Sequence, residues 1–125
     1  MKNFAKRFSR LLWIPLLLCS LAASGNTYKE ISLDQKIRQA DLVLIGEVAS
    51  VSGRNCMRSN RCADVRPVEI LKGKNIGSIR VLFNGEIAEQ NPLCCETGKH
   101  YLFIIKRIGD YYMSVNGPYG IYKLP

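Results

Sequence analysis

The sequence predicts a mainly β protein: a small closed or nearly closed barrel of five strands with one short N-terminal helix. Three observations support this fold class. Apolar segments with strand-like patterning follow one another at roughly even spacing after residue 41, glycine-marked turns separate them, and a helix start signal precedes the first. No internal repeat or low-complexity linker interrupts the pattern. We therefore expect one domain over residues 25–125.

The expected helix begins at a capping box. Ser32 can accept a hydrogen bond from the first-turn amides, and Gln35, three residues later, can reciprocate. We predict a helix over about Leu33 to Ala40, with Leu33, Ile37 and Ala40 on one face that packs onto the sheet.

The five strands differ in the signals that mark them. Gly46 interrupts the first strand and predicts a bulge or a sharp bend, whereas Pro67 places part of the second strand at an edge or a bulge. Gly109 and Asp110 form a hairpin turn signal between the last two strands. The expected strands cover residues 42–51, 63–71, 79–83, 101–105 and 111–115, followed by a short segment at 121–122.

Residues 1–24 have the order of a secretory signal peptide. Four basic residues up to Arg10 precede an apolar run, Leu11–Leu21, and three small residues follow that run. The run contains Pro15 and is shorter than the roughly 20 residues needed to span a bilayer, so we expect cleavage rather than anchoring. This predicts a secreted or periplasmic protein without a transmembrane segment after cleavage.

The expected cleavage site lies before Gly25, although a cut after Ala22 also satisfies the small-residue rule. Cys19 suggests a lipoprotein as an alternative. Bacterial lipoproteins need a small residue before the modified cysteine, and Leu18 occupies that position, so we expect no lipidation at Cys19.

Charge argues against a polyanionic partner. Because 14 of the 18 basic residues and all 10 acidic residues lie beyond residue 24, the mature chain has a net charge of +4 rather than +8. That mild excess does not favour nucleic acid as a partner.

Four cysteines lie beyond residue 24, and an even number in a short exported domain indicates disulfide bonds. A bond between the neighbours Cys94 and Cys95 would strain a small ring, so we favour links from the Cys56 and Cys62 segment to that pair. A structural zinc site is the alternative, but the spacing lacks two C-x-x-C pairs. We expect neither a metal nor a cofactor.

Three segments carry a resemblance to a known family: 40–48 (ADLVLIGEV), 68–73 (VEILKG), and 98–103 (GKHYLF) with Cys94 or Cys95 ahead of it. This order resembles bacterial members of the netrin-like group, which includes the tissue inhibitors of metalloproteinases, over about residues 33 to 123. The resemblance implies an OB-type five-stranded barrel. In that family a mature N-terminal cysteine chelates a protease zinc. A cut before Gly25 leaves Cys56 as the nearest cysteine, so we do not expect that mechanism here.

The most distinctive candidate site is the basic loop at residues 54–62. A disulfide-pinned loop of this kind can dock an acidic partner, because pinning removes ordering entropy and arginine makes forked contacts. A solvated hairpin loop is the alternative. The candidate partner-binding residues are Arg54, Met57, Arg58 and Arg61.

Catalytic constellations are weak in this sequence. His100 is the only histidine, so neither a His-rich metal site nor a triad with a second histidine can form. Four carboxylates, Asp34, Asp41, Glu47 and Glu69, allow a glycosidase-like pair in principle, but solvated acids are expected. Four tyrosines near the end of the sequence could form an aromatic platform for a glycan: Tyr111, Tyr112, Tyr119 and Tyr122. We expect instead that they pack the end of the barrel.

The sequence therefore predicts an exported, monomeric binding module without enzymatic activity. We expect its loops to recognise an exported or envelope protein, with a protease among the candidates and an inhibitor or accessory role. The alternative is an envelope-associated structural protein without a specific ligand.

Overall fold

The computed structural model describes residues 29–53, 56–58, 60–74 and 76–125. The predicted signal peptide and Arg54 lie outside this part of the chain. The elements, in chain order, are α1 (Leu33–Gln39), β1 (Leu42–Val51), β2 (Arg61–Lys72), β3 (Ile79–Phe83), the 3₁₀ turn η1 (Ala88–Gln90), β4 (His100–Ile108), β5 (Tyr111–Ser114), the 3₁₀ turn η2 (Gly117–Tyr119) and β6 (Ile121–Lys123).

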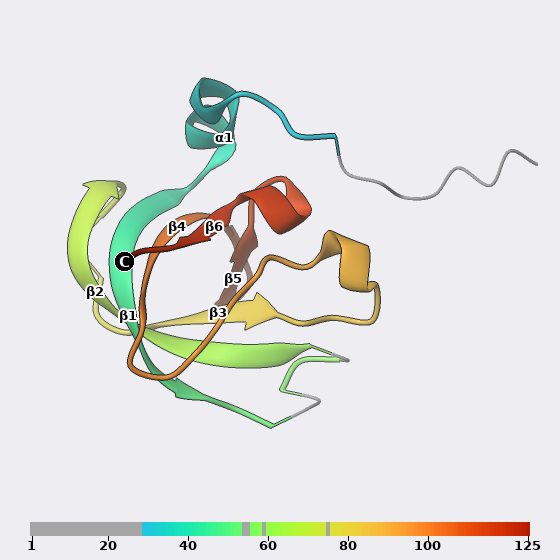
Figure 1. Cartoon of the computed structure of the whole chain (residues 1–125). Helices are drawn as coiled ribbons and strands as arrows, with labels where there is room; N and C mark the ends of the chain where they lie inside the picture. The colour runs from blue at the N-terminus through green and yellow to red at the C-terminus, as the bar shows by residue number, and fades with distance from the viewer. Residues whose placement is uncertain (1–28, 54–55, 59, 75) are drawn as a thin grey trace, which may run out of the picture.

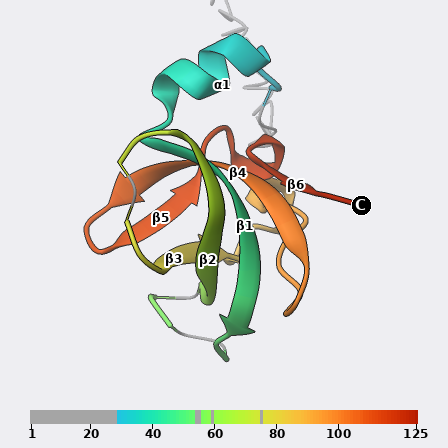
Figure 2. The ribbon, with the colours of Figure 1, turned by 90° about the vertical axis from the view of Figure 1, so that its left-hand side faces the viewer.

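Five strands close into an OB-type barrel, which confirms the predicted fold class. The strand order is β1-β2-β3-β5-β4, and β4 pairs back with β1 (Figures 1 and 2). The β3–β5 pairing is parallel, whereas the other pairings around the barrel are antiparallel. The short segment expected near residue 121 is a sixth strand, β6, which pairs with β4.

Helix α1 lies over one end of the barrel (Figure 2), and both of its ends are capped. The capping box is present: the Ser32 hydroxyl accepts from the Gln35 amide at 3.2 Å, and the Gln35 side chain accepts from the Ser32 amide at 3.1 Å. At the C-terminal end, Lys72 of β2 donates to the carbonyl oxygens of Ile37 and Ala40, each at 2.7 Å. Within the described residues, no helix has the length and apolar character to cross a membrane.

The predicted packing face of α1 is wrong. Ala40 is buried, but Leu33 and Ile37 remain 57% and 37% exposed, and Lys36 is the buried residue of the helix. The helix turns its Lys36 face toward the barrel because the Lys36 amine contacts a carboxylate, a hydroxyl and two aromatic rings at the barrel end.

The bend predicted at Gly46 is present. The β1–β2 register shifts between Ile45 and Gly46, and Gly46 lies opposite Pro67. β3 pairs with β2 over Arg61–Val65, so Pro67 lies beyond the part of β2 that β3 covers. Its missing N–H therefore removes no hydrogen bond to β3.

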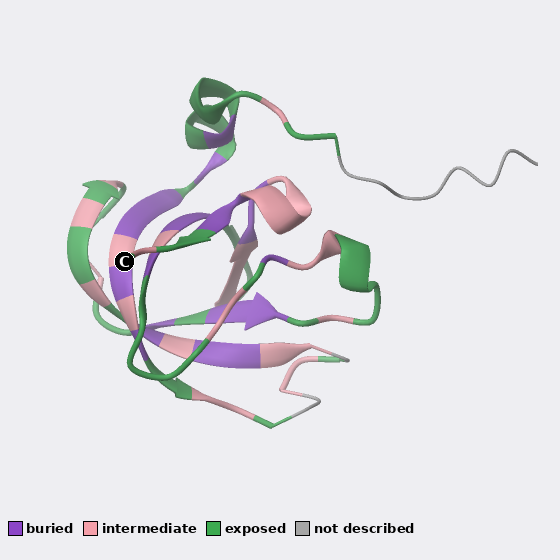
Figure 3. Cartoon of the chain, in the orientation of Figure 1, coloured by how far each residue is buried: buried purple, intermediate pink, exposed green. Residues whose placement is uncertain are grey.

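The core fills the barrel interior. Buried residues gather on the strands, while α1 and the turn containing η1 are largely exposed (Figure 3). The Tyr101 and Phe103 rings, both part of this core, pack 5.8 Å apart, centroid to centroid. Other fully buried core side chains include Leu44, Val48, Val65, Val81 and Ile105.

Candidate functional site

The β1–β2 connection and the start of β2 form a hairpin tip, which we define by the described residues 56–58 and 60–62. Its base is held where the Ser52 amide donates to the Cys62 carbonyl at 2.8 Å. A second, smaller antiparallel bridge joins Met57 to Asn60, and Arg58 adopts a left-handed backbone with φ 54° at the turn between them. The candidate loop is therefore an ordered hairpin at each of its described positions.

The predicted disulfide pairing is wrong, because each bond lies within its own segment. Cys56 bonds to Cys62, and Cys94 bonds to Cys95. The hairpin places Cys56 and Cys62 on its two arms with Cα atoms 5.8 Å apart, within the range for a disulfide. Cys94 and Cys95 lie in the β3–β4 connection, residues 84–99, and pack against the barrel core. The hairpin tip and this connection are therefore not tied to each other covalently.

Arg61 is the most firmly held cation of the hairpin tip. Its Nε donates to the Ser52 carbonyl at 3.2 Å, and its guanidinium carbon lies 5.5 Å from the centroid of the Phe83 ring. Neither neighbour carries a negative charge. Arg61 makes no ion pair with a carboxylate of the described residues.

Two neighbouring pockets open beside the hairpin tip, and Phe83, Asn91 and Pro92 line both. The Arg58 pocket, about 400 Å³, lies between the tip, η1 and the β5–η2 turn. The Arg61 pocket, about 820 Å³, lies between the β3–β4 connection and the η2–β6 segment. The structure thus brings Arg58 and Arg61 onto one hollowed face.

The remaining predicted loop residues contribute unequally. Arg58 is exposed, whereas Met57 is half-buried and its carbonyl accepts from the Asn60 amide at 3.0 Å. Met57 lines neither pocket, so its role is to build the turn rather than to face a partner. Arg54 cannot be placed, since it lies outside the described residues.

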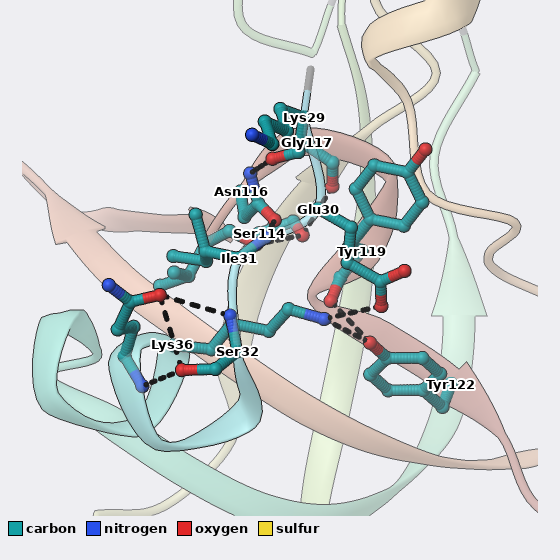
Figure 4. A network of polar contacts seen from close by, with 12 residues as sticks. Lys29, Glu30, Ile31, Ser32, Lys36, Ser114, Asn116, Gly117, Tyr119 and Tyr122 are labelled. Atoms are coloured by element: carbon teal, nitrogen blue, oxygen red, sulfur yellow. Dashed lines mark hydrogen bonds and ion pairs between the residues drawn. The ribbon is translucent and has the colours of Figure 1, made fainter.

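A buried lysine braces one wall of the Arg61 pocket. The Lys36 amine donates to the Tyr122 hydroxyl at 2.6 Å and to a Glu30 carboxylate oxygen at 2.9 Å, and it lies 5.6 and 5.4 Å from the ring centroids of Tyr119 and Tyr122 (Figure 4). The Tyr122 hydroxyl in turn donates to the Tyr119 carbonyl at 2.6 Å. Both tyrosines line the pocket, so α1 supports it from behind.

The N-terminal segment is tied to the same wall. The Ile31 amide donates to the Asn116 side-chain oxygen at 3.0 Å, and the Asn116 side-chain nitrogen donates to the Lys29 carbonyl at 3.0 Å (Figure 4). Asn116 itself has a left-handed backbone with φ 60°. This residue therefore joins the start of the described chain to the η2 turn.

The four tyrosines of the sequence do not form a single platform. Tyr119 and Tyr122 line the Arg61 pocket, whereas Tyr112 packs against the core from β5 and Tyr111 lies on the same strand. Sequence reasoning missed the pocket because its walls come from the β3–β4 connection, η2 and β6. The cysteine pair and the tyrosine crowd were its only sequence signals.

Two of the four candidate carboxylates, Asp34 and Glu47, make ordinary surface ion pairs. Glu47 lies 3.2 Å from Arg66 and 3.7 Å from the exposed His100. Asp34 pairs with Arg38 at 2.8 Å, one turn along α1. Within the described residues, no three His, Cys, Asp or Glu side chains gather in a way that could hold a metal.

No protein-family model matches the chain, and no curated protein matches it.

Proposed function

We propose that the chain is an exported, non-catalytic binding module whose hairpin tip docks an acidic segment of a protein partner. The observation that carries this proposal is the placement of Arg58 and Arg61. Both arginines stand on a covalently closed hairpin, both face pockets, and neither makes an ion pair with a described carboxylate.

Covalent closure matters because binding must otherwise restrict the loop. The Cys56–Cys62 bond and the Met57–Asn60 bridge hold the tip before a partner arrives. Less conformational entropy is then lost on docking. Arginine also offers several N–H donors in a fixed fork that matches a carboxylate.

Charge around the two pockets has the sign that this partner requires. Four basic side chains line them, namely Arg58, Arg61, Lys106 and Lys123, against two acidic ones, Glu86 and Glu96. Glu96 is paired with Lys123 at 2.9 Å, and this contact lowers the pKa of Glu96 and raises that of Lys123. Beyond that pair, Arg58, Arg61 and Lys106 stand against Glu86, so the pocket linings carry an excess of positive charge.

The netrin-like resemblance extends the proposal to an inhibitor or accessory role, with an exported protease as one candidate partner. The expected cut before Gly25 gives the mature chain no N-terminal cysteine, so inhibition would have to run through the loops. An envelope-associated structural protein without a specific ligand is the competing proposal.

The test compares two double variants with equal loss of charge. Arg58→Ser/Arg61→Ser removes the proposed contacts, whereas Arg38→Ser/Arg66→Ser removes two exposed arginines of α1 and β2. Each is expressed with its own signal peptide and crosslinked in the compartment that the protein occupies. We expect one specific partner to be lost with the first variant and retained with the second. Equal retention by both, with unchanged thermal stability, would contradict a docking role for the tip.

A second measurement tests export itself. Mass spectrometry of the purified protein is expected to give a mature N-terminus at Gly25 or Ala23. An intact N-terminus at Met1 would contradict export by signal cleavage, and a lipid on Cys19 would make the protein membrane-tethered.

A further inference from the structure

We propose that the Arg61 pocket receives an apolar side chain of the partner, and that a carboxylate next to that side chain pairs with the Arg61 guanidinium. This inference rests on the proposed docking function and names the chemistry of the docked segment.

The pocket presents apolar surface that the folded chain leaves in water. Leu93 is 91% exposed at its edge, although its neighbour Pro92 is buried. The Cys94–Cys95 disulfide adds a second, half-buried apolar wall, and the half-buried Tyr119 adds aromatic surface beside the buried Phe83. An exposed leucine beside such walls is typical of an interaction site, because its contact with water costs free energy that a docked apolar group would recover.

A sugar fits this pocket less well than a side chain does, because polar groups of its lining are already engaged. Both ends of the Asn91 amide bond to Gly85, at 2.9 and 3.0 Å. The Tyr101 hydroxyl accepts from the Glu96 amide at 2.9 Å. The Tyr122 hydroxyl accepts from Lys36 and donates to the Tyr119 carbonyl. Sugar recognition depends on several polar groups that are free to converge on hydroxyls. An apolar occupant needs none of them.

The charge at the pocket favours a carboxylate beside the apolar group. Lys123 is neutralised by Glu96, while Arg61 contacts the Ser52 carbonyl and the Phe83 ring. Its Nε is used by that carbonyl. A carboxylate docking at the terminal nitrogens would find a guanidinium already oriented by two contacts.

The walls are held in place before binding. Lys36 fixes Tyr119 and Tyr122 from α1, and the Asn91–Gly85 pair fixes the start of the β3–β4 connection. A pocket with such walls loses little freedom when it is filled, which favours a small anchor over a large flexible ligand.

The experiment uses the mature chain, labelled with ¹⁵N, and a capped six-residue peptide of sequence Gly-Ser-Phe-Asp-Ser-Gly as the probe. Two control peptides replace Phe with Ser or Asp with Asn. We expect the parent peptide to shift the backbone amides of Leu93, Glu96 and Tyr119, and each control peptide to bind at least about tenfold more weakly. Shifts elsewhere, or equal binding of all three peptides, would overturn the inference.

A protein variant separates this inference from the proposed function. Leu93→Ser removes exposed apolar surface at the pocket, and Leu71→Ser removes a 53% exposed leucine of β2 as a matched control. We expect Leu93→Ser alone to weaken the parent peptide by about tenfold. If the cellular partner is lost with Arg58→Ser/Arg61→Ser but kept with Leu93→Ser, the inference fails and the docking function stands. If the arginine variant keeps the partner, the docking function itself fails.

Discussion

The Lys36 amine lies 2.6 Å from the Tyr122 hydroxyl oxygen, and this hydrogen bond joins helix α1 to the C-terminal strand β6. The contact spans most of the described chain and explains how a cation tolerates burial. Lys36 is 2% exposed, but it has a carboxylate, a hydroxyl and two ring faces around its charge. The same contact holds the aromatic wall of the Arg61 pocket.

A double-mutant cycle measures this bond. Lys36→Met and Tyr122→Phe are each expected to lower the free energy of unfolding by about 1–3 kcal/mol, because each removes a hydrogen bond to a charged group. The double variant is expected to lose less than the sum, with a coupling of about 1 kcal/mol, since the two residues share one contact. Urea unfolding followed by circular dichroism gives the values.

Glu30→Gln serves as the control for that cycle. The Glu30 side chain is 56% exposed, so its pair with Lys36 is largely screened, and we expect a loss below about 1 kcal/mol. A larger loss than that of Tyr122→Phe would show that the carboxylate, rather than the hydroxyl, holds the amine.

The pH dependence of stability follows from the same residue. Burial alone would lower the pKa of Lys36, but hydrogen bonds and attraction from Tyr122 and Glu30 raise it above its ordinary value of 10.5. A cation with a raised pKa stabilises the fold fully below its unfolded-state pKa and loses that contribution as the pH rises through the folded-state value. Urea midpoints from about pH 8 to about pH 11 should therefore fall more for the wild type than for Lys36→Met. Parallel curves would contradict this assignment.

The strands could be predicted from the sequence because burial on a pleated surface leaves a local pattern. The run from residue 42 onward, the break at Gly46 and the edge signal of Pro67 all recur in the structure. The capping box at Ser32 is equally local, since it depends on residues three apart.

The inward face of α1 could not be predicted in the same way. Apolar periodicity assigned that face to Leu33 and Ile37, but the helix is only seven residues long and buries little surface. The Tyr122 hydroxyl that Lys36 contacts lies 86 residues away in sequence, and no local pattern reports it. Tertiary contacts therefore overrode the helical pattern.

The prediction of the disulfide pairing was wrong for a related reason. Ring strain argued against bonding Cys94 to Cys95, and nothing in the sequence showed that the hairpin places Cys56 opposite Cys62. The candidate arginines were predicted from their place between and beside Cys56 and Cys62 in the sequence. Their proximity to the β3–β4 connection required the closed barrel.

Peptide mapping tests the disulfide pairing directly. Trypsin cuts after Arg58 and Arg61, so the Cys56–Cys62 bond is expected to join two separate peptides under non-reducing conditions. The peptide with Cys94 and Cys95 is expected to run alone and to gain two hydrogens on reduction. Recovery of that peptide joined to either hairpin cysteine would contradict the structure.

Loss of the hairpin bond should affect stability and docking differently. Cys56→Ala/Cys62→Ala opens a loop of sequence separation 6, so we expect a loss of about 2 kcal/mol in unfolding free energy. Partner retention should fall even at a temperature where the variant is fully folded, because the tip then loses more entropy on docking. Unchanged retention by the folded variant would contradict the preorganisation of the tip.

Gly46 tests the tight bend in β1. A Cβ added there would lie 2.5 Å from a Val65 methyl carbon and 3.3 Å from the Phe103 ring, both in the core. Gly46→Ala is therefore expected to lower the free energy of unfolding by about 1–3 kcal/mol through overpacking. Gly53→Ala is the matched control, since no atom of the described residues lies within 4 Å of its Cβ position, and we expect a change within about 0.5 kcal/mol or a slight gain. If the two variants unfold at the same urea concentration, β1 relaxes around the added methyl group. The close packing of Val65 against Gly46 then does not determine the stability of the barrel.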